Sequence, residues 1–220
     1  MKPLIEGSWP SASNYFFLAI QVADAQARQL HAAMLYVCEG KLMIGDLQSH
    51  MTTRRSLAKA NKGIFWIAPD LSLEDQKILA SKLDAWLTLN ENGIPYSIAH
   101  PGGVIFENNI WVGNEPAQGL TCATFVVELF NELAIPFIAK ETWQARPGDD
   151  EWARHILELI GNMPAEHKEA QMRRIGMTAR IRPSDTFAAG MLINQETEDS
   201  LSFEVVSPCA EAIESNLLSS

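Results

Sequence analysis

Two largely apolar runs lie close together early in the chain and predict a β-hairpin. Residues 30–37 and residues 42–47 are separated by Cys38-Glu39-Gly40-Lys41, which has the glycine that a tight turn favours. The aromatic-rich residues 14–20 predict an earlier strand, although a helix over 14–30 fits the same pattern. Residues 64–68 predict another short strand that ends at Pro69.

Helical spacing of apolar positions begins after Ser72. The Ser72 hydroxyl is placed to cap a helix start, and Gly93 marks the end of the pattern. Between them, apolar residues recur every three or four positions, at Ile78, Leu79, Leu83, Trp86 and Leu87. The sequence therefore predicts a helix between Ser72 and Gly93.

A second helix is predicted over residues 122–134, after a Gly-, Asn- and Pro-rich loop over 95–119. Pro136 prevents its continuation. Its apolar stripe consists of Phe125, Val126, Leu129, Phe130 and Leu133.

The last third of the chain gives a mixed pattern. Residues 149–160 and 164–174 predict helices, and the tail from 211 to 220 is expected to fray. Three late strands are predicted, over residues 177–181, 190–194 and 202–206. Strands and helices that fall into separate groups indicate an α+β fold, and 220 residues suit a single domain spanning 1–220.

Composition narrows the function classes. The net charge of −10 disfavours nucleic acid as a partner, and we interpret Arg54-Arg55 and Arg173-Arg174 as solvated surface. No run approaches the roughly 18 apolar residues of a membrane helix, so we expect no integral membrane segment. The first residues lack a signal-peptide core, and three cysteines do not form a disulfide framework or zinc site. A cytoplasmic protein with reduced thiols is therefore expected.

Cys122 is the strongest candidate for chemistry, because it begins a hydrophobic helix. Free N–H groups and the helix dipole favour the thiolate there, and the same N–H groups can bind an oxyanion. The alternative interpretation is a buried cysteine that acts as a small hydrophobic side chain. Cys38 and Cys209 have no such setting and are predicted to be structural.

His31, at the start of a predicted strand, is the candidate base for Cys122. It can point at a helix N-terminus packed on the sheet, or it can simply cap the strand edge. Asp46, on the next strand, is the candidate that orients His31, with Gln48 and His50 as alternatives because the register is open. We expect His155 and His167 to face solvent. His100 lies in a loop, and no feature of the sequence supports a binding role for it.

Several motifs together resemble the circularly permuted NlpC-like, papain-fold cysteine amidases and peptidases of the YiiX/YaeF type. They are His-Ala-Ala-Met-Leu-Tyr-Val at 31–37, Gly-Ile-Pro-Tyr at 93–96, Thr-Cys-Ala-Thr-Phe-Val at 121–126 and Arg-Pro-Ser-Asp at 182–185. The resemblance covers about residues 30–190 as a pattern. It implies a central antiparallel sheet packed against helices, and closing strands that follow the 182–185 turn.

The same resemblance implies that Cys122 is the nucleophile, His31 the base and Asp46 the third residue. This chain has Gly45 where the family often has Glu, and Ala123 where it has serine. Residues 148–174 would be a helical insert. Relatives of this kind cleave or transfer amide, ester or thioester groups of peptides, peptidoglycan fragments or lipids without a cofactor.

Three functions follow as hypotheses. The first is a hydrolase that forms an acyl-enzyme on Cys122, and the second is an acyltransferase that passes the same acyl group to another acceptor. The third is a non-catalytic domain that binds a peptide or partner. Trp66 and Trp86 are predicted core residues, and Trp111 is the best of the remaining tryptophans to line a substrate cleft; the others are Trp9, Trp143 and Trp152.

Overall fold

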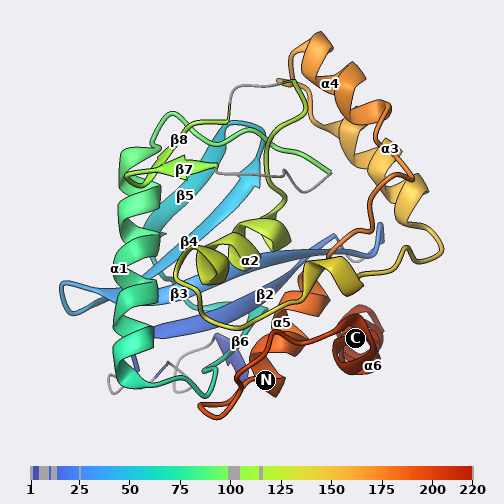
Figure 1. The fold of residues 1–220 in the computed structure, drawn as a ribbon. Helices are drawn as coiled ribbons and strands as arrows, with labels where there is room; N and C mark the ends of the chain where they lie inside the picture. The colour runs from blue at the N-terminus through green and yellow to red at the C-terminus, as the bar shows by residue number, and fades with distance from the viewer. Residues whose placement is uncertain are drawn as a thin grey trace.

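A computed structural model of the chain shows an α+β fold built on one antiparallel sheet (Figure 1). The structure describes residues 2–4, 10, 14–24, 26–98, 105–113 and 116–219. The sheet has the strand order β1-β6-β2-β3-β4-β5. Its strands are β1 (Lys2–Leu4), β2 (Phe16–Asp24), β3 (Gln29–Cys38), β4 (Lys41–Ser49), β5 (Thr52–Leu57) and β6 (Asn61–Ile67).

The predicted hairpin is confirmed as β3 and β4, and Cys38 pairs with Lys41 across the turn. Glu39 and Gly40 both have positive φ, at 51° and 73°, as a two-residue type I′ turn requires. Residues 16–24 form a strand rather than a helix. The strand β5 was not predicted, because its sequence is polar and its side chains are mostly exposed.

Alternation along the central strands divides the core between the two faces of the sheet. Phe16, Leu18 and Ile20 of β2 face the larger cluster with the helices, and Phe17 and Ala19 face the smaller one with Trp66. Trp86 is also fully buried, so both tryptophans predicted to be core residues are core residues.

The helices α1 (Leu73–Leu89), α2 (Cys122–Glu132) and α5 (Pro183–Leu192) contribute to the larger cluster. Ser72 caps α1 by accepting a hydrogen bond from the N–H of Asp75, as predicted. In Figure 1, α2 lies over the sheet, while α3 (Asp149–Leu159) and α4 (Ala165–Met172) lie to one side. Both of the latter were predicted. A short hairpin of β7 (Phe106–Glu107) and β8 (Ile110–Trp111) lies in the 95–119 loop, and a 3-10 turn covers Lys140–Thr142.

The three late strands predicted from the sequence are wrong. Residues 177–181 have no regular secondary structure, 190–192 end α5, and 203–206 begin α6 (Phe203–Leu218). The first eight residues of α5 are all buried, and residues 187–193 form an apolar run. A short apolar run of this kind does not distinguish a buried helix from a strand. The 182–185 segment therefore begins a helix rather than leading to closing strands.

The tail from residue 211 was also predicted wrongly, because most of it belongs to α6. Its buried residues recur at helical spacing on one side, at Val206, Ala210, Ile213 and Leu217. This stripe packs α6 against α5. Among the described residues, no helix has the length and apolar character needed to cross a membrane.

Candidate active site

Cys122 is the first residue of α2, and a reciprocal cap fixes the helix start. The N–H of Thr124 donates to Oγ1 of Thr121 at 3.0 Å, and the N–H of Thr121 donates to Oγ1 of Thr124 at 2.7 Å. The N–H groups of Cys122 and Ala123 lie in the first turn, where no intrahelical acceptor exists. They are therefore placed to bind a negatively charged oxygen beside the thiol.

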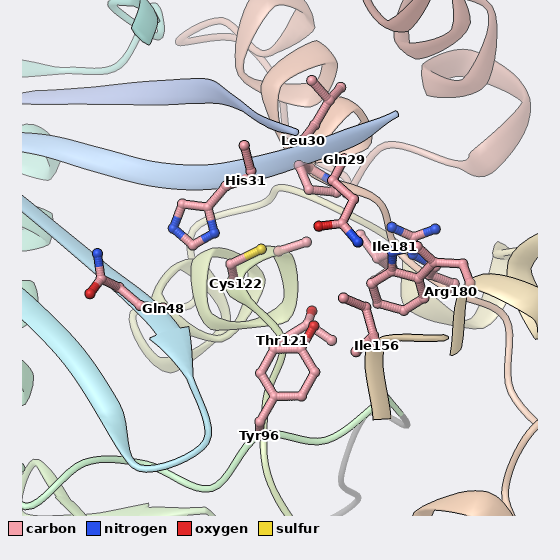
Figure 2. A pocket seen from close by; sticks show the side chains of 14 residues that line it. Gln29, Leu30, His31, Gln48, Tyr96, Thr121, Cys122, Ile156, Arg180 and Ile181 are labelled. Carbon is pink, nitrogen blue, oxygen red and sulfur yellow. The ribbon is translucent and has the colours of Figure 1, made fainter. Parts of the chain in front are cut away.

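His31 projects from β3 toward the start of α2, and its ring lies next to the Cys122 sulfur (Figure 2). Met34, three residues after His31 on β3, pairs with Gly45 of β4. Because the strands are antiparallel, the same register places His31 opposite Gln48. Asp46 is then the diagonal neighbour of His31 on the same face. The Nε2 atom of His31 lies 3.0 Å from Oδ2 of Asp46.

Asp46 is fully buried and has two cationic neighbours. Its Oδ2 atom accepts a hydrogen bond from Nη2 of Arg54 in addition to facing His31. The His31 ring N–H is not aligned with the carboxylate as in a regular hydrogen bond, so their contact is chiefly electrostatic. With Nε2 on Asp46, the other ring nitrogen, Nδ1, faces the sulfur.

The pKa values of the two groups shift in opposite directions, as in an ion pair. Burial raises the pKa of the Cys122 thiol, but the charge and hydrogen bond of His31 and the backbone N–H of Ala32 lower it more, so the net pKa is lowered. Burial lowers the pKa of His31, but the Cys122 thiolate and Asp46 raise it more. A thiolate beside an imidazolium is thus the favoured state.

A pocket of about 130 Å³ opens beside Cys122, which is 9% exposed. Figure 2 shows it between the starts of β3 and α2 and the side chains of α3 and residues 180–183. Polar or aromatic lining residues include Gln29, Gln48, Tyr96, Thr121, Trp152 and Arg180. Cys122 is thus largely buried, and it lines an open pocket of a size that suits a small group.

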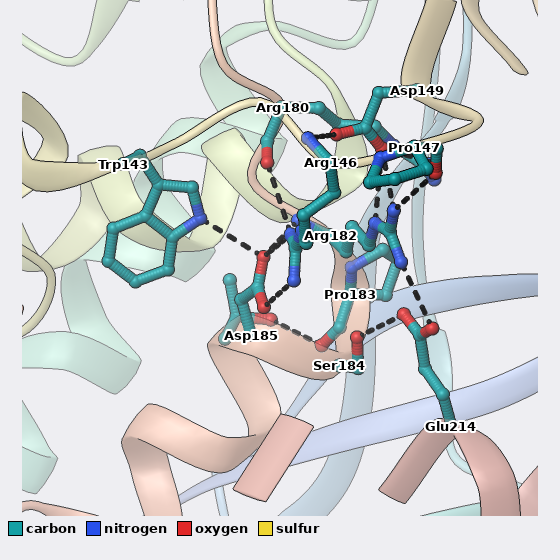
Figure 3. A network of polar contacts seen from close by, with 11 residues as sticks. Trp143, Arg146, Pro147, Asp149, Arg180, Arg182, Pro183, Ser184, Asp185 and Glu214 are labelled. Carbon is teal, nitrogen blue, oxygen red and sulfur yellow. Dashed lines mark hydrogen bonds and ion pairs between the residues drawn. The ribbon is translucent and has the colours of Figure 1, made fainter. Parts of the chain in front are cut away.

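A network of ion pairs fixes the segment that closes this pocket (Figure 3). The buried carboxylate of Asp185 accepts hydrogen bonds from Nη1 and Nη2 of Arg146, at 2.9 and 2.5 Å, and from Nε1 of Trp143 at 3.1 Å. Nη2 of Arg146 also donates to the backbone oxygen of Arg180 at 3.3 Å. Arg182 links Asp149 of α3 to Glu214 of α6. The network thus sets the position of Arg180 at the pocket.

Of the alternatives to Asp46, Gln48 lines the pocket and His50 does not. The Nδ1 atom of His50 instead accepts a hydrogen bond from the N–H of Tyr96 at 3.3 Å. His167 was predicted to face solvent, but it is half-buried and its Nε2 lies 2.8 Å from the backbone oxygen of Tyr96. His155 is exposed, as predicted, and His100 lies outside the described residues.

Among the tryptophans, Trp152 lines the pocket and Trp111 does not, so the prediction for Trp111 is wrong. Trp111 packs edge-on against Phe106, and its N–H donates to the backbone oxygen of Gly113. Trp143 is buried, and Trp9 lies outside the described residues.

The interpretation of Arg54-Arg55 as solvated surface is wrong for Arg54, which is half-buried and contacts Asp46, whereas Arg55 is exposed as predicted and pairs with Asp84. Arg54, Trp152 and Arg180 were not identified as site residues from the sequence. The position of Arg54 could have indicated its role. Arg54 follows Asp46 across the tight connection between β4 and β5, and the two residues pair in the sheet. Trp152 and Arg180 reach the pocket only through tertiary packing and had no local signal.

Cys38 and Cys209 are half-buried free thiols, and burial raises the pKa of each. Within the described ranges, no group of three or more His, Cys, Asp or Glu side chains is arranged to hold a metal ion.

No protein-family model matches this chain, and comparisons with curated proteins and with solved structures give no significant match. Any functional conclusion therefore rests on the geometry of Cys122, His31 and Asp46.

Proposed function

We propose that this protein is a cysteine hydrolase that cleaves an amide or related acyl bond through an acyl-enzyme on Cys122, on a permuted papain-like, NlpC-type fold. The observation that carries the proposal is the proximity of Cys122, His31 and Asp46, with 3.0 Å between His31 Nε2 and Asp46 Oδ2 and with the pKa of the thiol lowered. A thiolate, a base and a group that orients the base are what nucleophilic acyl chemistry needs.

The reaction begins with attack of the Cys122 thiolate on the substrate carbonyl carbon. A C–S bond forms, and the carbonyl oxygen takes the negative charge beside the N–H groups at the start of α2. The C–N or C–O bond then breaks, and Nδ1–H of His31 gives its proton to the leaving group. Asp46 stabilises the imidazolium that is present before this transfer.

Water completes the cycle. His31 takes a proton from water, the resulting hydroxide attacks the thioester carbon, and the C–S bond breaks. The acid product leaves and the thiolate and imidazolium are restored. The small pocket supports a compact, polar acyl group over the long lipid chain that a lipid acyltransferase would hold.

The test is intact-mass analysis of the protein during reaction with p-nitrophenyl acetate. We expect a transient acetyl adduct that maps to Cys122 and is removed by water. Cys122→Ala should form no adduct at this position, and His31→Ala should form it at least tenfold more slowly. His155→Ala, which replaces an exposed histidine, is the matched control and should react normally. An adduct that forms at the same rate in His31→Ala contradicts the proposal.

A further inference from the structure

Arg180 is a charged side chain at the pocket that the proposed reaction does not use. Its guanidinium carbon lies 3.3 Å from the centroid of the Trp152 ring, so one face of the group is stacked on the indole. Both residues line the pocket that contains Cys122. Figure 2 labels Arg180 at this pocket. Stacking fixes the guanidinium plane and leaves its edge of N–H groups for a planar partner.

The donors of Arg180 are poorly satisfied within the protein. Its Nε atom is buried with no hydrogen-bond partner, and its ion pair with Asp149 is long, at 3.6 Å between Nη1 and Oδ1. That carboxylate is held more closely by Arg182, at 3.0 Å, and its Oδ2 atom accepts the N–H of Arg146. Asp149 therefore compensates Arg180 only in part.

A second unsatisfied donor lies at the same pocket. The Nε2 atom of Gln29 is buried with no partner, and Gln29 lines the pocket with Arg180. An unpaired buried donor costs free energy. A ligand oxygen that accepts a hydrogen bond from such a donor removes this cost, which favours binding. Burial also lowers the pKa of Arg180 to about 10, which reflects a cation short of compensating charge.

The charge balance of the pocket favours an anion. The Cys122 thiolate and the His31 imidazolium cancel, and among the lining residues that the structure describes the remaining ionised side chain is Arg180. The chain as a whole carries −10, so this local positive charge is opposite in sign to the net charge of the protein.

From these contacts we infer that the substrate carries a carboxylate close to the scissile carbonyl, and that Arg180, stacked on Trp152 and assisted by Gln29, binds that carboxylate. The inference rests on the proposed function for the identity of the scissile bond. It names the substrate class as a small amide or ester with an ionised carboxyl group close to the scissile carbonyl, such as an acylated amino acid.

Binding can be tested without catalysis in the Cys122→Ala variant. The probes are N-acetylglycine, which has a carboxylate, and N-acetylglycinamide, which does not. The signal is the indole N–H resonance of Trp152 in ¹⁵N-labelled protein, assigned with Trp152→Phe. We expect a saturable shift with N-acetylglycine and binding at least tenfold weaker for the amide.

Arg180→Gln should weaken the binding of N-acetylglycine about tenfold or more, whereas Arg154→Gln should leave it unchanged. Arg154 is an exposed arginine of α3 and gives the same change in net charge. Equal binding of the two probes, no saturable shift with either, or an unaffected Arg180→Gln variant would overturn the inference.

Alkylation of Cys122 separates this inference from the proposed function. With Cys38 and Cys209 replaced by alanine, Arg180→Gln should lower the rate with iodoacetate about tenfold and the rate with iodoacetamide less than twofold. An equal loss with both reagents overturns the inference, because Arg180 then acts on the thiolate. Ordinary reactivity toward iodoacetamide together with selective binding of N-acetylglycine contradicts the hydrolase and supports the carboxylate site.

Discussion

The Nε2 atom of His31 and the Oδ2 atom of Asp46 lie 3.0 Å apart, on neighbouring strands and on the face that meets α2. The same oxygen of Asp46 accepts a hydrogen bond from Arg54, so one buried carboxylate serves two cations. Burial of a lone carboxylate is costly, and these two cations offset that cost for Asp46. The negative charge in turn favours the protonated form of His31, which supports the thiolate of Cys122.

The first prediction concerns the pH dependence of Cys122 alkylation by iodoacetamide. The lowered pKa of Cys122 means that the thiolate, and with it the rate, persists below the ordinary thiol pKa of about 8.5 and is lost only as the pH falls further. In His31→Ala the imidazolium that attracts the Cys122 thiolate is gone, while the burial of Cys122 remains. The pKa of Cys122 should therefore exceed the ordinary thiol value. At pH 7 the rate should then fall at least about tenfold.

The measurement is the second-order rate from pH 4 to 10, with Cys38 and Cys209 replaced by alanine. A wild-type profile with its midpoint at about 8.5 or higher would contradict the ion pair.

The second prediction concerns Asp46→Asn, which removes the charge that faces His31. We expect kcat of the acyl reaction to fall by roughly 10²–10⁴, with a smaller change in KM, because the imidazolium loses its stabilising partner. Asp84→Asn is the matched control. Asp84 also pairs with an arginine, Arg55, with 2.8 Å between Oδ1 and Nε, but it accepts a further hydrogen bond from Tyr36 and not from His31. Equal kcat values for the two variants would argue against a role for Asp46.

The third prediction concerns the cap of α2. Thr121→Ala removes the acceptor of the Thr124 N–H and should lower the free energy of unfolding by about 1 kcal/mol. It should also slow alkylation of Cys122, since the first turn then frays beside the thiol. Ser72→Ala removes the equivalent cap of α1 and should cost about the same stability with no change in alkylation. Urea denaturation and iodoacetamide kinetics give the two readouts, and parallel slowing in both variants would refute the local effect.

The fourth prediction concerns Gly119, three residues before Cys122. A Cβ atom there would lie 2.4 Å from the backbone oxygen of Pro95, which cannot move aside as a side chain can. Gly119→Ala should therefore lower the free energy of unfolding by about 1–3 kcal/mol and reduce activity, because the strand-like contact of Leu120 with Pro95 positions the start of α2.

Gly161→Ala is the control for this prediction, since a Cβ atom at Gly161 has no neighbour within 4 Å. Thermal unfolding of both variants is the measurement. A Gly119→Ala protein as stable and active as Gly161→Ala would show that the Pro95 contact does not constrain the site.

Local sequence patterns were sufficient where the spacing of apolar residues, the helix caps and the turn residues all indicated the same element. The hairpin of β3 and β4 was readable from two apolar runs and Gly40, and α1 from Ser72 and its apolar stripe. Cys122 at a helix start was readable because capping and helix dipole are local effects. His31 and Asp46 were candidates because a tight turn limits which residues of two strands can meet.

Tertiary structure decided what local pattern could not. A largely buried helix such as α5 contains an apolar run like that of a buried strand, so only its packing on the sheet distinguishes the two. Arg54 was undetermined because a polar edge strand gives no clear periodic signal. Arg180 and Trp152 reach Cys122 from 30 or more residues along the chain, and only the packing of α3 and the network around Asp185 bring them there. Long-range contacts of this kind depend on the whole fold, and no local pattern encodes them.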